Sequence, residues 1–132
     1  MPGRAAAPIS GRALEDAVAA LATRLGLRVH RQLRVGRRIW GAERRIDLIL
    51  DHQPSGRRLG LECKFQGRTG TAEEKIPAVI DDIAAWPIDG LVVVDGQGFS
   101  ANMRAYLLST GKAVFLADLE TWLRLYFGLE LG

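Results

Sequence analysis

The chain has 132 residues, a length that fits one domain and leaves no room for a second. Of these residues 48% are apolar and 25% are charged, which is a globular composition. No apolar run approaches the roughly 18 residues of a membrane span, and the first ten residues lack the apolar centre of a secretory signal. A single cysteine, Cys63, excludes an internal disulfide and favours a reducing compartment. We therefore expect a flexible leader over residues 1–9 and one cytoplasmic domain over residues 10–132, with no membrane partner.

The net charge of +3 conceals an uneven distribution. Residues 1–68 carry 14 Lys/Arg against 6 Asp/Glu, a balance of +8, whereas residues 69–132 carry 4 against 9, a balance of −5. A basic half suits a polyphosphate partner, because each neutralised phosphate releases counterions. The alternative is a solvated surface rich in arginine for reasons of growth temperature or genome composition. The clustering of the charge favours nucleic acid.

The first predicted element is a helix. Ser10 can cap its N-terminus, and Gly26 can adopt the conformation that often follows a helix. The apolar residues between them recur at helical spacing, which predicts an amphipathic helix with one face in the core. These residues are Leu14, Val18, Leu21 and Leu25.

An arginine-rich β region follows this helix. Residues 27–50 are rich in strand-forming residues, with bends expected at Gly36 and Gly41, and they predict two or three strands. A turn cluster over residues 51–56 leads into a strand over residues 58–66. The connections are too short for crossover helices, so we expect antiparallel pairing.

The second half begins with a further helix. Thr71 and Glu74 form the T-x-x-E pattern of a capping box, which predicts a helix that runs to about Trp86 and stops before Pro87. Pro77 lies near the start of this helix, where a missing N–H costs least.

Helices and strands alternate in the rest of the chain. Residues 90–95 form a continuous apolar run ending in an acid, which predicts a central strand buried on both faces. We expect a helix over residues 100–110, a strand over 113–116 and a helix over 118–127. The order α-β-β-β-α-β-α-β-α predicts an α/β domain with a mixed central sheet flanked by helices.

An acid interrupts one of the predicted strands. Ile46, Leu48 and Leu50 should share one face of this strand, and Asp47 should share the other face with Ile49. An acid on a sheet face that also carries apolar residues is a candidate site residue. The alternative is a sheet face that is simply polar.

The next strand carries a second acid and a cation. Glu62 and Lys64 share one face, and Cys63 points to the other. Neighbouring strands lie about 4.8 Å apart, so the carboxylates of Asp47 and Glu62 could bridge one divalent cation. Two acids with a lysine suit Mg²⁺-assisted phosphodiester cleavage, whereas without a metal ion the lysine would merely pair with the acids.

These residues resemble the bipartite D…ExK signature of the PD-(D/E)XK nuclease superfamily, in which Asp47 stands fifteen positions before the Glu62 of Glu62-Cys63-Lys64. Ile46 stands where the name-giving pattern has proline. The resemblance covers residues 10–95, and it implies a restriction-endonuclease-like αβββαβ core and a DNA endonuclease that uses Mg²⁺, with Mn²⁺ as a substitute. It also implies that Asp47, Glu62 and the backbone carbonyl of Cys63 hold the ion, while Lys64 assists the nucleophile or the developing charge.

Further site residues follow from the same resemblance. Glu15 on the first helix would reach the ion directly or through water, with Asp16 as the competing choice. Gln66 matches a polar accessory residue, although a strand-edge amide could equally satisfy backbone groups. Lys75 could contact a substrate phosphate, with an ordinary helix-surface ion pair as the alternative.

A set of arginines is expected to grip the DNA backbone. Trp40, which lies among them, is the one tryptophan that we consider for base stacking. The arginines are Arg31, Arg34, Arg37, Arg38, Arg44, Arg45 and Arg68.

Several functions remain open at this point. One site cuts one strand, so double-strand cleavage or junction resolution would need a homodimer. A structure-selective, junction-resolvase-like endonuclease is the first interpretation, a small restriction-type or phage-type nuclease is the second, and a nuclease domain of a larger protein is the third. The rivals are a non-catalytic nucleic-acid-binding domain that retains the fold and a structural subunit with a polar sheet face that binds no Mg²⁺.

Overall fold

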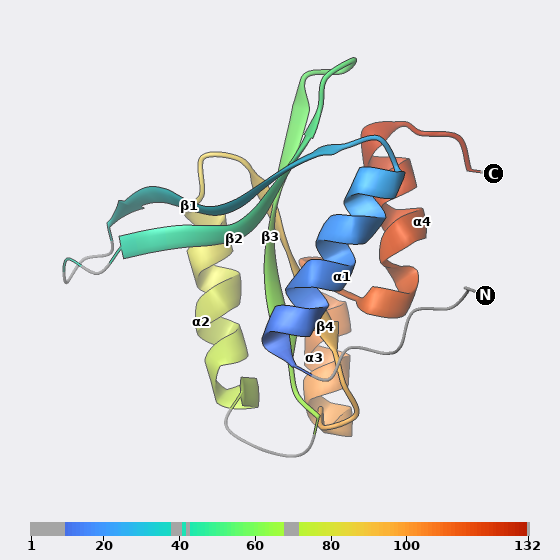
Figure 1. The fold of residues 1–132 in the computed structure, drawn as a ribbon. Coiled ribbons are helices and arrows are strands. Elements are labelled where there is room, and N and C mark those ends of the chain that lie inside the picture. Colours follow the sequence, from blue (N-terminus) through green and yellow to red (C-terminus); the bar gives the residue numbers. More distant parts are fainter. Residues whose placement is uncertain (1–9, 38–40, 42, 68–71, 132) are drawn as a thin grey trace.

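The structure, a computed structural model, describes residues 10–37, 41, 43–67 and 72–131, and for residues 72–75 it describes the backbone alone. Within these residues, five strands form one mixed sheet in the order β1-β2-β3-β4-β5, and four helices pack against its two faces (Figure 1). The predicted α/β class with a mixed sheet is confirmed, and this is the restriction-endonuclease-like arrangement that the resemblance implies. No helix in the described part of the chain is long and apolar enough to span a membrane.

The elements follow the predicted order. They are α1 (Gly11–Arg24), β1 (Arg28–Arg37), β2 (Glu43–His52), β3 (Arg57–Phe65), α2 (Ala72–Ala84), β4 (Asp89–Asp95), α3 (Ala101–Thr110), β5 (Ala113–Phe115) and α4 (Leu116–Phe127). The predicted antiparallel pairing of β1, β2 and β3 is confirmed, and β3, β4 and β5 pair in parallel through the crossover helices α2 and α3.

The strands predicted over residues 58–66 and 90–95 run over Arg57–Phe65 and Asp89–Asp95, and the bounds of α2, β5 and α4 also need correction. The helix expected to reach Trp86 ends at Ala84, because Ala85 and Trp86 continue as turns and Trp86 packs into the core. The strand expected to reach Leu116 ends one residue earlier, and the final helix begins at Leu116 rather than at Asp118. Local sequence does not mark these ends, because it is tertiary packing that determines them.

Each face of the sheet has its own apolar cluster. The first cluster joins α1 and α4 to residues such as Leu48, Leu50 and Leu61. The second joins α2 and α3 to residues such as Ile46 and Val92. Figure 1 shows α1 and α4 side by side on one side of the sheet, with α2 on the other.

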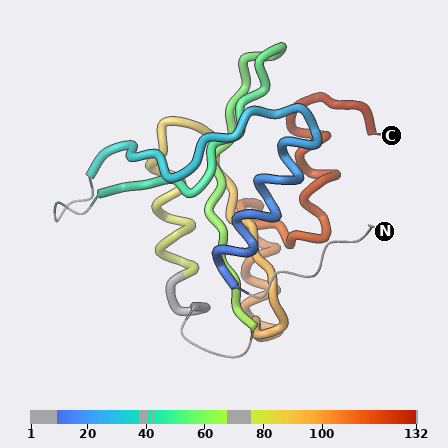
Figure 2. The backbone as a smooth tube through the Cα atoms, viewed as in Figure 1, coloured from blue at the N-terminus to red at the C-terminus, as the bar shows by residue number. Residues whose placement is uncertain are grey.

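The alternation of side chains along β2 breaks at Asp47. We expected Ile46 on the same face as Leu48 and Leu50, but Ile46 belongs to the second cluster and the other two belong to the first, so that prediction was wrong. The break lies where pairing between β2 and β3 ends, at Leu48 and Leu61, and where Gln32 of β1, opposite Asp47, leaves extended geometry with φ +56°. Beyond this point β2 pairs with β1 alone. Figure 2 shows these paired ends of β1 and β2 projecting from the body of the molecule.

A glycine joins the end of β3 to the loop after β4. Gly96 has φ +108°, and a Cβ there would lie 2.2 Å from the backbone oxygen of Gln66. The N–H of Gly98 donates to that same oxygen over 2.7 Å. The close approach of two backbones therefore requires glycine at position 96.

We predict that Gly96→Ala lowers the free energy of unfolding by about 3 kcal/mol, because neither backbone can move away without breaking hydrogen bonds. Gly111→Ala is the matched control, since Gly111 also has a positive φ (+67°) but open space around it, and should cost about 1 kcal/mol. Urea unfolding of both variants measures the difference. Equal losses would contradict the close backbone contact.

Candidate functional site

The carboxylate of Asp47 is held from both neighbouring strands. At this residue β2 has left β3, and Asp47 Oδ2 accepts the backbone N–H of Cys63 over 3.0 Å. Asp47 Oδ1 accepts the side-chain amide of Gln32, on β1, over 3.3 Å. The side chain thus replaces a backbone pairing that the departing strand no longer provides.

Gln32, which contacts two of the candidate acids, is a candidate site residue that the sequence did not predict. Its neighbours Arg31 and Leu33 pair with Leu48 and Ile46, so Gln32 stands across β1 and β2 from Asp47. Its φ is +56°, and among the described residues it is the one non-glycine residue with a positive φ. Such a backbone costs on the order of 1–3 kcal/mol. No spacing rule points to Gln32, because only the strand register reveals it.

Glu15, rather than Asp16, is the acid of α1 that faces Asp47. The Glu15 side chain is 12% exposed, and its Oε2 accepts the same Gln32 amide over 3.3 Å. Its other oxygen lies 3.0 Å from the Arg31 guanidinium. Asp16 is 55% exposed and pairs with Arg31 and Arg12 at the rim. The geometry therefore favours the first of the two choices that the sequence left open.

Glu62 and Lys64 lie on the face of β3 opposite the Cys63 thiol, as expected. Lys64 Nζ is 3.8 Å from Glu62 Oε2. Glu62 Oε1 is, in the described part of the chain, the one buried side-chain oxygen or nitrogen without a hydrogen-bond partner. Leaving a buried carboxylate oxygen unpaired is costly, which makes this atom an open coordination point.

Burial perturbs both acids of the signature. It raises the pKa of Glu62 to about 7, with the Asp47 charge as the next contribution and Lys64 opposing them. It also raises the pKa of Asp47, and the hydrogen bond from Cys63 opposes that effect. Because these carboxylates are desolvated and repel each other, a cation placed between them would stabilise their ionised forms.

The residues present fit a divalent cation bound through oxygen. When all three are ionised, Asp47, Glu62 and Glu15 carry three negative charges, against which Lys64 and Arg31 supply two positive ones. No three Asp, Glu, His or Cys side chains in the described chain are grouped closely enough to hold an ion by themselves. The direct donors would thus be Asp47 and Glu62, with a backbone oxygen such as that of Cys63 and solvent, and Glu15 would act through water; such an oxygen set suits Mg²⁺.

The Cys63 thiol takes no part in this set. It packs in the core between the sheet, α1 and α4, and burial raises its pKa far above the usual range. A thiol in this state is inert. If Cys63 contributes to the site, it does so through its backbone.

The structure describes the side chain of one accessory candidate, Gln66, but not that of the other, Lys75. Gln66 is buried, and its Nε2 donates to the carbonyl oxygen of Gly98 over 2.9 Å, so the side chain serves the loop after β4. This contact matches the alternative in which the amide satisfies backbone groups. The side chain of Lys75 lies outside the described residues, as do Arg38, Trp40, Arg68 and Thr71.

The predicted DNA-binding arginines fall into two groups. Arg31 is bound to Glu15 and Asp16, and Arg44 forms a half-buried ion pair with Asp82 of α2 over 2.9 Å. Both therefore brace the fold with most of their charge already paired. The others lie on the β1–β2 hairpin and are more open to solvent; they are Arg34 (52% exposed), Arg45 (54% exposed) and Arg37, which donates to the carbonyl of Gly41.

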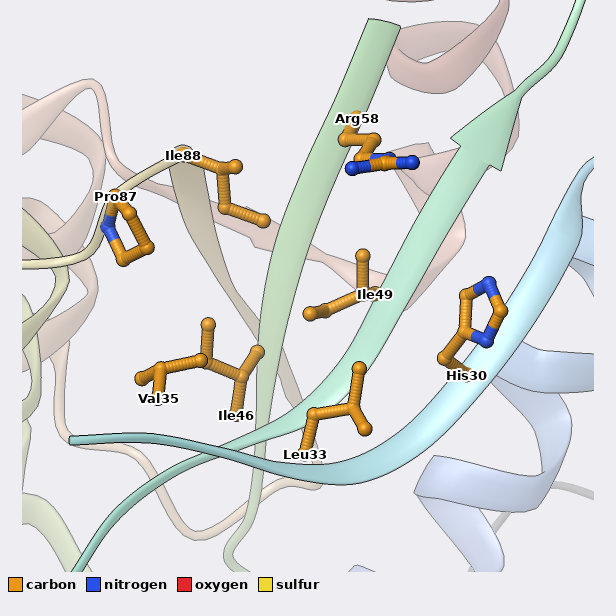
Figure 3. A pocket seen from close by; sticks show the side chains of 8 residues that line it. All are labelled: His30, Leu33, Val35, Ile46, Ile49, Arg58, Pro87 and Ile88. Atoms are coloured by element: carbon orange, nitrogen blue, oxygen red, sulfur yellow. The ribbon is translucent and has the colours of Figure 1, made fainter.

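An apolar pocket of about 370 Å³ lies beside the same hairpin (Figure 3). Leu33, Val35, Ile46 and Ile49, from β1 and β2, line it together with Pro87 and Ile88, which directly precede β4. His30 and Arg58 supply its polar lining, and no acid of the described residues lines it. The pocket is therefore separate from the carboxylates that could hold an ion.

We predict that Glu62→Gln stabilises the ion-free protein at high pH. The folded pKa of Glu62, about 7, lies above its ordinary value, so the stability contribution of this group is present at low pH and is lost as pH rises through 7. The variant lacks this loss. Relative to wild type, it should gain on the order of 2–3 kcal/mol between pH 5 and pH 8 in EDTA.

Urea unfolding at the two pH values measures this gain. Glu120→Gln serves as the control, because Glu120 is half exposed on α4 and paired with Arg124. A difference between Glu62→Gln and wild type that stays constant from pH 5 to pH 8 would contradict the strained carboxylate.

The fold has relatives among solved structures. A protein of unknown function, AF1548, aligns with a TM-score of 0.55 and 19% identity over 78% of this chain and 56% of its own. Protein VC1899 from Vibrio cholerae aligns with a TM-score of 0.58 and 17% identity over 89% of this chain and 34% of its own. A repair endonuclease from Pyrococcus abyssi gives a TM-score of 0.47 and 13% identity over 84% of this chain and 48% of its own. The chain thus spans between 34% and 56% of these proteins.

Comparison with curated protein sequences found no match. The family described as a "PD-(D/E)XK nuclease superfamily domain" matches residues 6–121, which include every described candidate of the site. With the D…ExK residues on adjacent strands of a mixed sheet, the chain belongs to the PD-(D/E)XK nuclease superfamily.

Proposed function

We propose that this domain is a deoxyribonuclease that hydrolyses phosphodiester bonds with Mg²⁺ as its cofactor and Mn²⁺ as a substitute. The observation that carries the proposal is the unpartnered, buried Glu62 Oε1, next to Asp47 and within reach of Lys64. A structural subunit with a merely polar sheet face has no reason to keep such an atom, because an unmet buried carboxylate destabilises the fold.

The roles of the residues follow from their surroundings. Asp47 and Glu62, with the Cys63 carbonyl, would hold the ion, and Glu15 would support it from α1. When bound, the ion would lower the pKa of a water and neutralise phosphate charge. Lys64 is mostly buried beside Glu62, where a cation acts strongly on charge that develops at the phosphate.

The substrate we propose is DNA gripped by the β1–β2 hairpin. Arg34 and Arg45 are more than half exposed, and the acid that both contact, Glu43, is itself 38% exposed, so they can reach phosphates without losing a buried partner. A chain of this size has little surplus for reading bases, so we favour a structure-selective, junction-resolvase-like activity over a small restriction-type or phage-type one. Cutting both strands would require a second copy, so we propose a homodimer.

We predict that Lys64→Ala lowers the cleavage rate by at least about 100-fold while DNA binding persists. The measurement is cleavage of labelled duplex, single-stranded, flapped and four-way-junction DNA in Mg²⁺, Mn²⁺ or EDTA. Lys112→Ala is the control, because Lys112 is an exposed lysine just before β5. The preferred substrate would choose among the nuclease subclasses. DNA binding without metal-dependent cutting in wild type would instead identify a non-catalytic binding domain.

We predict that Arg34→Gln and Arg45→Gln each weaken binding to all DNA sequences alike. Each should reduce the slope of log affinity against log salt by about 1, as expected for one lost phosphate contact. Arg24→Gln, at the far end of α1, should leave the slope unchanged. Fluorescence anisotropy over a salt series in EDTA gives the slopes, and an unchanged slope in both hairpin variants would place the DNA elsewhere.

A further inference from the structure

Gln32 lies between the acids that come from two different elements. Its side-chain Nε2 is 3.3 Å from Asp47 Oδ1 on β2 and 3.3 Å from Glu15 Oε2 on α1. A side-chain amide nitrogen has two protons, so it can donate one to each acid. Two like charges that would otherwise repel each other thereby share one neutral donor.

The unfavourable backbone conformation of Gln32 supports a role for its side chain. A φ of +56° places the residue in the left-handed region, which glycine adopts without steric cost. A glutamine in the middle of β1 with this backbone is unfavourable unless its side chain contributes something that glycine lacks. The contacts to Glu15 and Asp47 are the contribution visible here.

These contacts complete a continuous chain of hydrogen bonds across four elements. It runs from Arg31 to Glu15, then through Gln32 to Asp47, and ends at the N–H of Cys63. Each oxygen of Asp47 thus has one donor, Gln32 on one side and Cys63 on the other. Each also keeps a second lone pair that a cation can use.

We propose that Gln32 is a positioning residue of the ion site, which fixes Asp47 as a direct ligand of one cation and keeps Glu15 of α1 beside it, where Glu15 can act on the cation through water. The part that concerns the cation rests on the proposed function. The part that concerns the arrangement of Asp47 does not, because the hydrogen bonds exist without an ion. Partners of this kind typically change metal affinity by about 10–100-fold when removed.

The test uses Gln32→Gly, which fits the backbone better but removes the amide. In EDTA, hydrogen exchange of the Cys63 amide, followed by NMR, should become at least about threefold faster, because Asp47 loses one of its two anchors. Mn²⁺ affinity, measured by calorimetry, should weaken about tenfold. Gln53→Gly is the matched control, because Gln53 is an exposed glutamine in the β2–β3 turn, and it should change neither value.

Gln32→Glu separates hydrogen bonding from side-chain size. It keeps the length of the side chain but cannot donate when ionised, so it should also leave the Cys63 amide exchanging fast in EDTA. Wild-type exchange and wild-type Mn²⁺ affinity in Gln32→Gly would overturn the proposal, since only the backbone would then matter. If wild type binds no Mn²⁺ but Gln32→Gly still accelerates exchange at Cys63, the proposed function fails while the positioning of Asp47 by Gln32 stands.

Discussion

The arrangement of the whole site depends on one replacement, that of a backbone hydrogen bond by a side chain. Where β2 separates from β3, the N–H of Cys63 would lose its partner, and the carboxylate of Asp47 takes that place. The separation opens the space in which acids can face an ion, and the replacement fixes one of those acids in it. Because Glu62 and Lys64 flank Cys63 on β3, the same bond sets the distance between the two halves of the signature.

This arrangement brings several negatively charged side chains together in a half-buried site. Glu15, Asp47 and Glu62 raise one another's energy, and Arg31, Gln32 and Lys64 offset part of that cost. Removing the strain entirely would give a more stable domain with no reason to bind a cation. In many enzymes the arrangement of charged groups that activity requires lowers the free energy of unfolding in the same way.

The sequence predicted the features that neighbouring residues determine. Ser10 caps α1 through the N–H of Ala13, and the apolar run of β4 is buried as its composition implied. The two halves of the D…ExK motif were found because each lies within one strand. Spacing along a strand says which face a residue takes, so the alternation within residues 58–66 was enough to place Glu62 and Lys64 together.

Features that depend on pairing between distant segments could not be predicted in this way. The break in alternation at Asp47 lies where pairing between β2 and β3 ends, which no single strand reveals. The positive φ of Gln32 and its place opposite Asp47 come from the register of β1 on β2. The arginines show the same limit, because Arg31 finds Glu15 16 positions away and Arg44 finds Asp82 38 positions away. A count of basic residues cannot say which of them are already paired.

The hairpin arginines have a second consequence, which concerns association between molecules. β1 is ten residues long and forms one edge of the sheet, whereas β5, at the other edge, has only three. A long, flat edge strand is a template for pairing with another chain, and β1 departs from flatness at Gln32 and at the irregularity between Arg34 and Gly36. Its exposed arginines add charge repulsion between like edges. Residues that we assign to DNA thus also keep this edge from aggregating.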